Sequence, residues 1–545
     1  MKKMLKRLTC LSLVLLMLLS FCSCGGDKGA DAQLVYPIDK DPRYLDPQII
    51  YDIGAKNIIA NCFEGLVAID SDGSIIPAAA ESWETNTAET RYTFHLRKDM
   101  KWKVTSAAGR VLGENYETEF DSRVTAHDFA FGLTRALLPE TLCPGADSLF
   151  SVKNAKKVYK GTLKPSALGI KALDDYTLQI TLSQADPDFL YTLTESYCMP
   201  CNEEFFEKTG GRYGLATRYL IYNGPFYINN WADDVSVSVR KSDAYHSKDE
   251  VMPASVYYSI NNEQPTRLKK LTDATYSAAP LTEKQAVELS EKKDYTVNTF
   301  PSSVTALILN CGDEALKNEN IRKGIVSSFD YSVIENALGE CDAPGLIPDS
   351  FLTGSLKFSE YRKETDRYSN PSPLTVFKKG LSETEQTGVS VTVLCSEENE
   401  NTVRALMQSW QSVLGVSFTV YAEATDEVTL RERISSGDYQ IALADISFTG
   451  NRAYSILSSF SSSSKNSFTF LKDKNYNSLL SEMKKADGIA PLSARAKKAE
   501  QYLISACVAV PLYKKDNYYG LGKKVSGVVH NVSGEIVYFK TAVKK

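Results

Sequence analysis

Hydrophobic and polar residues alternate along several short stretches of the N-terminal half of the chain. The clearest examples are residues 90–98, 176–182 and 235–239, and in the first of them Tyr92 and Phe94 fall on one face. A period of two places successive side chains on opposite faces of an extended chain. Each of the three stretches is therefore expected to form a half-buried β-strand.

The pattern changes between residues 389 and 444. Apolar stretches at 389–394 and 416–421 predict two strands, and apolar residues at helical spacing predict a helix over 403–414 between them. Gly415 follows the helix as a stop. Strand, helix and strand in this order form a βαβ unit, so the C-terminal half is expected to have an α/β fold.

An amphipathic stretch at 428–434 and an apolar strand at 440–444 extend the same predicted parallel sheet. Ligands of open parallel sheets bind beyond the carboxyl ends of the strands. The segment directly after Ala444 is therefore a candidate for ligand contact.

The first residues predict an export signal over residues 1–23. Four basic residues within the first seven positions precede an apolar run at 8–21 that ends in small residues and cysteine. The run is too short to span a bilayer comfortably, since about 20 apolar residues are needed, and no comparable stretch follows. These observations exclude a polytopic membrane protein.

The end of this signal resembles the lipobox of bacterial lipoproteins, in which a cysteine that follows small residues is acylated. We expect Cys24 to be the lipid anchor, because Ser23 suits the position before the modified cysteine. Cys22 is the alternative, although Phe21 suits that position poorly, and an ordinary cleaved signal also stays open. Residues 24–33 are small and polar and predict a flexible tether.

Charge and length narrow the class of protein further. Of the 545 residues, 62 are basic and 67 acidic; without the four bases of the signal the balance is 58 to 67, a net charge of −9. This mild acidity argues against nucleic acid as a partner. More than 500 residues follow the tether, which exceeds the size of a single hydrophobic core, so two or more lobes are expected.

Cysteine and histidine residues give no sign of a metal site, a cofactor or catalysis. Cys198 and Cys201 have the spacing of a redox motif or half a zinc site, but no second such pair exists, so a local disulfide or two free thiols are expected. The four histidines are isolated from one another, and no phosphate loop or nucleophile elbow occurs. We therefore expect a binding protein, not an enzyme.

Several motifs together resemble the extracellular solute-binding proteins of the oligopeptide, dipeptide and nickel transporter type, known as family 5. They occur in the family's order, and their positions are residues 44–47, 63–67, 80–84, 92–98, 124–129, 223–226, 320–323 and 344–348. Single motifs also have structural explanations, such as turn chemistry at Asn223-Gly224-Pro225. The resemblance spans nearly the whole chain after the signal.

The resemblance implies an α/β fold of the periplasmic-binding-protein-like type II. Two large lobes joined by crossing strands enclose the ligand by hinge closure, and a third, smaller lobe is inserted in the first. The expected boundaries are 34–67, 168–262 and 506–545 for lobe I, 68–167 for the small lobe II, and 263–505 for lobe III.

The resemblance also implies the function of a substrate-binding lipoprotein of an ABC importer. Such a protein, monomeric and lipid-anchored at the extracytoplasmic face of the bacterial membrane, captures a small ligand, here expected to be an oligopeptide. It delivers the ligand to a membrane permease, and a separate ATPase supplies the energy. The alternatives are a secreted cell-surface hydrolase, a non-peptide ligand such as a sugar or metal chelate, or a role in signalling.

Peptide-binding members of the family hold the ligand's amino terminus with an Asp-Tyr pair that follows a strand. Thr449-Gly450 occupies this position here, and a neutral threonine cannot form a charge-assisted bond to an ammonium. Either Asp445 substitutes, or a free amino terminus is not recognised in the usual way. The residues expected to line the cleft are Tyr51, Ile53, Asp445, Ser447, Phe448, Thr449, Gly450 and Arg452, with Arg433 as a partner for a ligand carboxylate.

Overall fold

The structure is a computed structural model that describes residues 32–545 except for several short gaps. The gaps are 71–73, 187, 262, 330, 333–334, 336–342, 344, 350, 354–355, 361, 363–366, 447–452, 463–466, 487–488 and 532–533. The predicted signal and both candidate anchors, Cys22 and Cys24, lie outside the described residues. Within the described ranges, no helix has both the length and the apolar character needed to cross a membrane.

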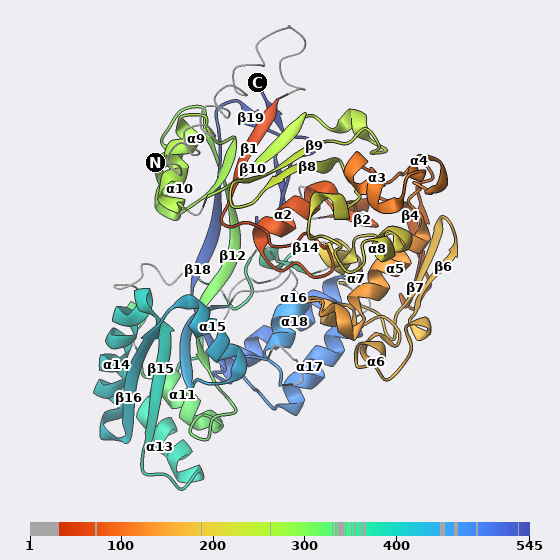
Figure 1. The fold of residues 1–545 in the computed structure, drawn as a ribbon. Coiled ribbons are helices and arrows are strands. Elements are labelled where there is room, and N and C mark those ends of the chain that lie inside the picture. Colours follow the sequence, from red (N-terminus) through yellow and green to blue (C-terminus); the bar gives the residue numbers. More distant parts are fainter. Residues whose placement is uncertain are drawn as a thin grey trace.

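Two bodies joined by a pair of long strands make up the molecule (Figure 1). The strands are β12 (Thr296–Leu309) and β18 (Ala509–Leu521), which pair antiparallel with register shifts near their middle. We call residues 32–295 and 522–545 the upper body and residues 310–508 the lower body. This arrangement confirms the expected fold of two large lobes connected by crossing strands.

The central sheet of the upper body has the order β1-β10-β9-β8. Strand β1 runs parallel to β10, and the remaining pairs are antiparallel. Their bounds are β1 (Gln33–Ile38), β8 (Phe226–Ala232), β9 (Ser236–Lys241) and β10 (Ser255–Ile260). The predicted strand at 235–239 corresponds to β9. Helix α2 (Ile53–Cys62) lies against this body and begins at Asp52, whose carboxylate accepts a hydrogen bond from the backbone N–H of Ala55 at 2.8 Å.

A second sheet, of order β4-β5-β7-β6, lies at the other side of the upper body. Its strands are β4 (Ala80–Thr85), β5 (Arg91–Leu96), β6 (Ile170–Asp174) and β7 (Thr177–Thr181). The predicted strands at 90–98 and 176–182 are confirmed and pair with each other, with Phe94 opposite Leu178. The sheet thus continues beyond residue 167, where the small lobe was expected to end.

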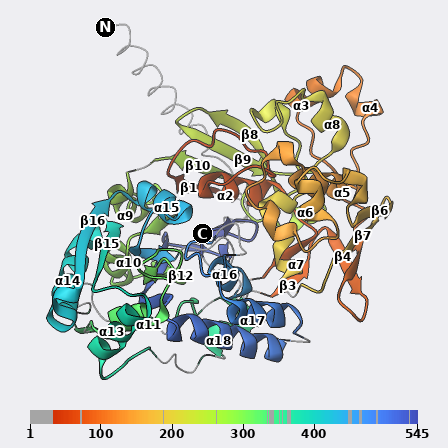
Figure 2. The same cartoon turned by 90° about the horizontal axis from the view of Figure 1, so that it is seen from below.

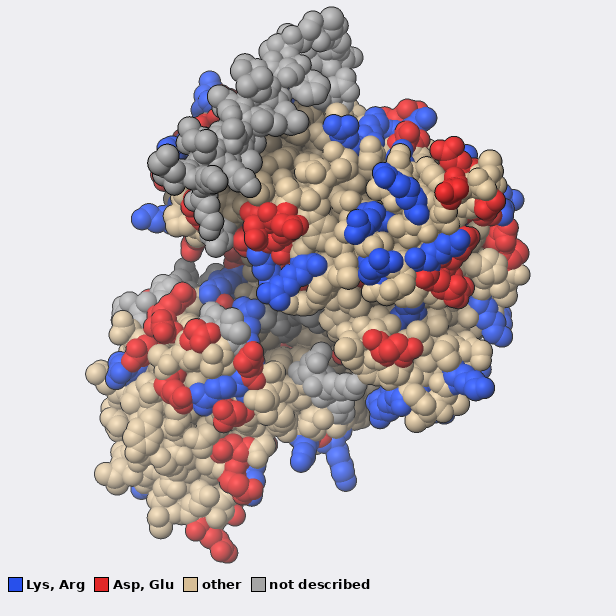
Figure 3. Space-filling view, viewed as in Figure 1, with Lys and Arg blue, Asp and Glu red and all other residues tan. Residues whose placement is uncertain are grey.

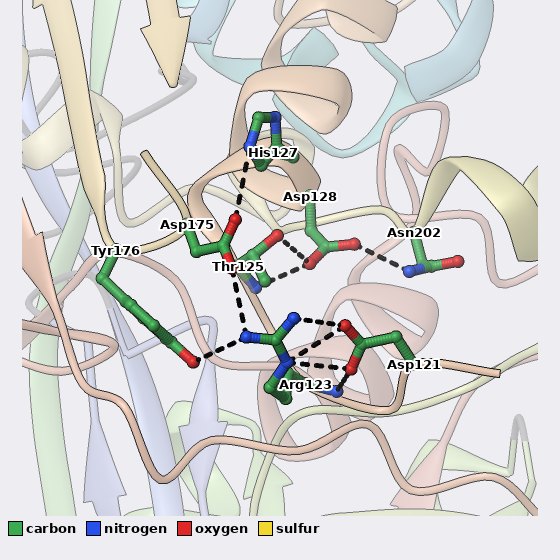
Figure 4. A network of polar contacts seen from close by, with 8 residues as sticks. All are labelled: Asp121, Arg123, Thr125, His127, Asp128, Asp175, Tyr176 and Asn202. Atoms are coloured by element: carbon green, nitrogen blue, oxygen red, sulfur yellow. Dashed lines mark hydrogen bonds and ion pairs between the residues drawn. The ribbon is translucent and has the colours of Figure 1, made fainter. Parts of the chain in front are cut away.

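Helix α5 (Ala126–Ala136) begins within the motif at 124–129 and shows that these residues are structural. Asp128 accepts hydrogen bonds from the backbone N–H and the hydroxyl of Thr125 at 2.7 and 3.0 Å, which closes a capping box. Asn202 donates to the other carboxylate oxygen at 2.9 Å (Figure 4). Burial raises the pKa of Asp128 to about 6, against the effect of these hydrogen bonds.

Arg123 links the loop before α5 to the turn between β6 and β7. Its guanidinium donates to Asp121 at 2.6 Å and to Asp175 at 3.1 Å, and His127 lies 3.7 Å from the same Asp175 (Figure 4). These side chains are largely exposed and lie outside the cavity described below. The network therefore ties the loop before α5 to this sheet.

The lower body contains the predicted βαβ unit. Strand β15 (Val389–Ser396), helix α14 (Glu400–Leu414) and strand β16 (Phe418–Thr425) follow in this order, and the two strands pair in parallel. Strand β17 (Ile441–Ile446) pairs in parallel with β15, as the sequence predicted. The complete sheet has the order β11-β18-β12-β17-β15-β16 and is mixed, because β12 and β18 run antiparallel to their neighbours.

Both faces of this sheet are covered by helices. Successive residues of β12 alternate between two hydrophobic clusters, with Ala306 and Ile308 in one and Leu307 and Leu309 in the other. The first cluster includes the helices α16 (Ala453–Ser459), α17 (Lys474–Lys484) and α18 (Ile489–Ser505). The second includes α11 (Glu319–Ser327), α13 (Pro373–Glu383) and α14. Strand β17 and the second half of β15 are thus buried on both faces, which explains their continuous apolar runs, whereas the edge strand β16 alternates between buried and more exposed residues.

The segment with α9 (Arg267–Thr272), β11 (Ala278–Leu281) and α10 (Glu283–Ser290) packs on the upper body, although the predicted lobe III begins at 263. Strand β11 pairs with the upper end of β18, and the backbone N–H of Ser277 donates to the carbonyl of Val35 in β1 at 2.8 Å. Strand pairing distant in sequence therefore determines where this segment lies.

Candidate functional site

A cavity of about 1430 Å³ lies between the two bodies. Most of its wall comes from the upper body, and the lower body contributes Arg431 from α15 (Glu427–Ser436) together with residues of α16 and α17. Seen from below, α16 and α17 face α7 (Phe189–Thr192) of the upper body (Figure 2). The surface is hollowed where the bodies meet, and acidic and basic side chains are intermixed around it (Figure 3).

One wall of the cavity is formed by α2 and the chain near the C-terminus. Asn57 donates to the carbonyl of Glu535 at 3.1 Å and accepts from the N–H of Val537 at 2.7 Å. Asn61 donates to the carbonyl of Val537 at 2.7 Å and accepts from the N–H of Phe539 at 2.8 Å. Because the asparagines are four residues apart, they lie on one face of the helix and hold residues 535–539 along it.

Tyr51 and Ile53, two of the predicted cleft residues, line this cavity. Their exposed fractions are 63% and 41%. The amine of Lys40 lies 5.8 Å from the ring centroid of Tyr51. The structure therefore leaves both side chains available to a ligand.

Asp445, the proposed substitute for the missing carboxylate, already has a cationic partner. Its carboxylate lies 2.7 Å from the amine of Lys515 on β18 and accepts a hydrogen bond from the hydroxyl of Thr305 on β12. Burial lowers the pKa of Lys515. The charge of Asp445 and its hydrogen bond to the amine act in the opposite direction, and the pKa is raised overall. Asp445 is not among the residues that line the cavity. A ligand ammonium would have to compete with Lys515 for it.

Arg433, predicted as a partner for a ligand carboxylate, contacts the protein instead of the cavity. Its guanidinium pairs with Glu423 at 2.6 Å and Asp438 at 2.9 Å. Arg431, two residues earlier on α15, lines the cavity. Residues two positions apart lie on different faces of a helix. The sequence therefore predicted the helix correctly, but not which of its faces lines the cavity.

The other predicted residues lie outside the described part of the chain. They follow β17, as expected from the strand's end, and are Ser447, Phe448, Thr449, Gly450 and Arg452. Their contact with a ligand stays a prediction.

A hydrogen-bonded group that the sequence did not reveal lines the upper wall. His246 Nε2 lies 2.7 Å from one carboxylate oxygen of Glu64, Tyr245 donates its hydroxyl proton to the other, and Ser247 Oγ lies 2.9 Å from His246 Nδ1. Burial, with the nearby Glu64, raises the pKa of Tyr245. Serine, histidine and a carboxylate also form hydrolytic triads, but there the serine contacts Nε2 and the carboxylate Nδ1, the reverse of this order.

At one place in the cavity, a cationic side chain of the lower body faces two carboxylates of the upper body. On the lower body, the amine of Lys484 lies 5.0 Å from the ring centroid of Tyr454. Burial raises the pKa of Tyr454, Lys484 opposes this effect, and Asp186 and Asp188 of the upper body add to it. The four residues are therefore close together, with the cation on the lower side and the carboxylates on the upper side.

Cys198 and Cys201 are buried free thiols, one of the two states that the sequence left open. Burial raises the pKa of Cys201 to about 12, although Arg135 lies 3.5 Å from its sulfur. The same arginine forms a buried ion pair at 2.7 Å with Asp46, a residue of the motif at 44–47. In the described ranges, no group of three or more histidine, cysteine or acidic residues is placed to hold a metal ion.

A mixed α/β fold with two bodies around one large cavity defines a protein that encloses a solute. The family model of the bacterial extracellular solute-binding proteins, family 5 (Middle), matches residues 74–468. The chain belongs to this family.

Relatives and solved structures cover almost all of the chain. The oligopeptide-binding protein OppA of Bacillus subtilis (strain 168) is 26% identical over 559 residues, 98% of each chain. The "Probable deoxycholate-binding periplasmic protein YgiS" of Escherichia coli (strain K12) is 24% identical over 511 residues, 93% of this chain and 92% of that one. The structure of Haemophilus influenzae OppA in complex with RPPGFSPFR has a TM-score of 0.73 at 23% identity and covers 95% of this chain and 100% of that chain.

Proposed function

We propose that the protein is the substrate-binding lipoprotein of an ABC importer and captures an oligopeptide between its two bodies. The observation that carries the proposal is the cavity of about 1430 Å³, which exceeds the roughly 300–1,000 Å³ of sites for drug-sized molecules. A cavity of this size accommodates a short peptide. The names of the relatives support this ligand class, because several are oligopeptide-binding proteins.

The two-body architecture suits capture and release. A ligand between the bodies contacts both of them, so its binding favours the closed arrangement over the open one. Closure buries the ligand and slows its escape. The protein acts as a monomer outside the cytoplasm, with Cys24 acylated, and transfers the ligand to a membrane permease whose ATPase supplies the energy.

Native mass spectrometry of the protein purified from a bacterium tests the ligand class. We expect additional masses that match peptides, that disappear after denaturation, and that remain unchanged on prolonged incubation because no bond is broken. A bile acid as the retained molecule would contradict the oligopeptide and keep the transport role. Hydrolysis of the bound peptide would overturn the function as a whole.

The anchor is tested by a palmitate-labelling experiment with Cys24→Ser and Cys22→Ser variants. We expect Cys24→Ser to lose the label and Cys22→Ser to keep it. The opposite result would move the anchor to Cys22, and labelling of neither variant or of both would contradict a single anchor among these two cysteines.

A further inference from the structure

Three charged side chains from three separate segments meet at one wall of the cavity. Lys56 comes from α2, Glu195 directly precedes the short helix η4 (Ser196–Cys198), and Glu535 lies in the segment that Asn57 holds along α2. Helix α2 contacts both other elements. All three side chains line the cavity, so a bound ligand can reach them.

Neither carboxylate has an ion-pair or hydrogen-bond partner among the residues that the structure describes. Burial raises the pKa of Glu195 and of Glu535, and Glu195 raises that of Glu535 further. Lys56 acts in the opposite direction on both. One lysine is thus shared by two carboxylates, and the desolvation of the carboxylates is only partly compensated.

Two other buried carboxylates of this protein each have a direct arginine partner, which distinguishes them from this pair. Glu500 in the lower body is fully buried and accepts hydrogen bonds from Arg362 at 2.7 Å and from the N–H of Ile347 at 2.8 Å. Asp46 pairs with Arg135 at 2.7 Å. Carboxylates that serve the fold therefore have partners here, whereas the two at the cavity wall do not.

Arg431 reaches the same region from the lower body. It lines the cavity and lowers the pKa of Glu535, which shows that it lies near this carboxylate on the opposite wall. Arg431 also takes part in other interactions of its own. The cluster of Lys56, Glu195 and Glu535 by itself therefore combines two carboxylates with one amine, an excess of one negative charge.

We infer that Glu195 and Glu535 bind a positively charged group of the ligand, an ammonium or guanidinium, from the upper wall of the cavity. This inference rests on the proposed function and specifies the ligand as a peptide with a cation. Two sources supply such a group, the free amino terminus and a lysine or arginine side chain. The pair would replace Asp445, which Lys515 occupies, as the anionic contact.

Four synthetic pentapeptide libraries distinguish these sources. They combine a free or an acetylated amino terminus with the presence or absence of lysine and arginine, and the amount that the protein retains is measured by mass spectrometry. We expect the wild-type protein to retain at least one cationic library about tenfold or more above the acetylated library without basic residues, the gain typical of a charge-assisted hydrogen bond. Which cationic library is retained identifies the source.

The variant Glu195→Gln/Glu535→Gln removes both charges and keeps the shape of the side chains. We expect it to retain the cationic and the neutral libraries equally. The matched control is Glu288→Gln/Glu291→Gln, which removes two exposed carboxylates of the upper body outside the cavity and should keep the full preference. Without ligand, the Glu195→Gln/Glu535→Gln variant should unfold at the same or a higher temperature, whereas loss of a structural ion pair would lower it.

The outcomes separate this inference from the function on which it rests. Equal retention of all four libraries by the wild-type protein, or an unchanged preference in Glu195→Gln/Glu535→Gln, overturns the inference and leaves peptide capture in place. Retention of none of the libraries by the wild-type protein overturns both.

Discussion

The upper and lower walls of the cavity are built in different ways. Much of the upper wall is held by buried polar groups that bind one another, such as Asn57 with the backbone at 535–539 and Glu64 with His246. The lower wall exposes the ends of charged side chains, Arg431 and Lys484, from helices that have their own core. Substitutions of these partnered groups of the upper wall should therefore cost stability, whereas those in the lower wall, like those of Glu195 and Glu535, should cost affinity.

The largest effect is expected from Asn57→Ala/Asn61→Ala. The two asparagines are 2% and 1% exposed, and their loss leaves backbone groups of residues 535–539 without partners. A buried unsatisfied group costs about 1–3 kcal/mol, so the total loss should reach about 3 kcal/mol or more. The midpoint of denaturant unfolding measures it, with the exposed Asn229→Ala as control. An unchanged midpoint would show that this wall does not depend on the hydrogen bonds of Asn57 and Asn61.

Glu64→Ala should destabilise the protein less, by about 2 kcal/mol, because it removes the acceptor of Tyr245 and the partner of His246. Glu64→Gln keeps an acceptor oxygen and should restore part of the loss. Thermal unfolding of the two variants side by side checks the order. Equal stability of Glu64→Ala and the wild-type protein would mean that water replaces the carboxylate without cost.

In the lower wall, Arg431→Ala should weaken peptide binding by about two- to fivefold with little change in unfolding temperature. Its charge faces carboxylates of the upper wall, and a partly exposed pair contributes about 1 kcal/mol or less. Arg433→Ala is the control, because this side chain pairs with Glu423 and Asp438 outside the cavity. Calorimetry at two salt concentrations should show a weaker salt dependence for Arg431→Ala only. An equal effect of both variants would contradict the assignment.

The smallest effect concerns pH. The pKa values of Glu195 and Glu535 are raised in the folded state, so protonation favours folding, and this contribution is lost as the pH rises through the raised values. The charged and titratable groups that face the pair are Lys56, Tyr197, Cys198, Arg431 and Tyr538. Relative to Glu195→Gln/Glu535→Gln, the ligand-free wild-type protein should gain stability as the pH falls from neutral towards about 4.3, the ordinary glutamate value. If the difference in unfolding temperature between the wild-type protein and this variant stays constant over that pH range, the raised pKa values of the two glutamates are contradicted.

Local periodicity was sufficient to predict the elements whose burial is regular. The βαβ unit at 389–425 and the strand pair around Phe94 and Leu178 have apolar faces that depend only on nearby sequence. The motifs of family 5 then supplied the two-lobe architecture. The positions of β6, β7 and β11 required strand pairing across long separations, which periodicity does not encode.

The candidate site was harder to predict for the same reason. Tyr51 and Ile53 were found because they follow a family motif, and both line the cavity. Glu195 and Glu535 are 340 positions apart in the sequence and meet only because α2 contacts both segments. His246 looked isolated in the sequence, since its partner Glu64 is distant along the chain. A lone polar residue gives no local sign of such partners.

The paired strands β12 and β18 have a mechanical consequence. Their ladder is interrupted at 301–303 and again at 305–306, between the two bodies. Irregularities of this kind bend and twist a two-stranded ribbon locally. A ribbon is more compliant across its thin dimension than within its plane, so the bodies should swing along one arc without sliding sideways. Each closure would then bring the same residues to face each other, Arg431 near Glu535 and Lys484 near Asp186.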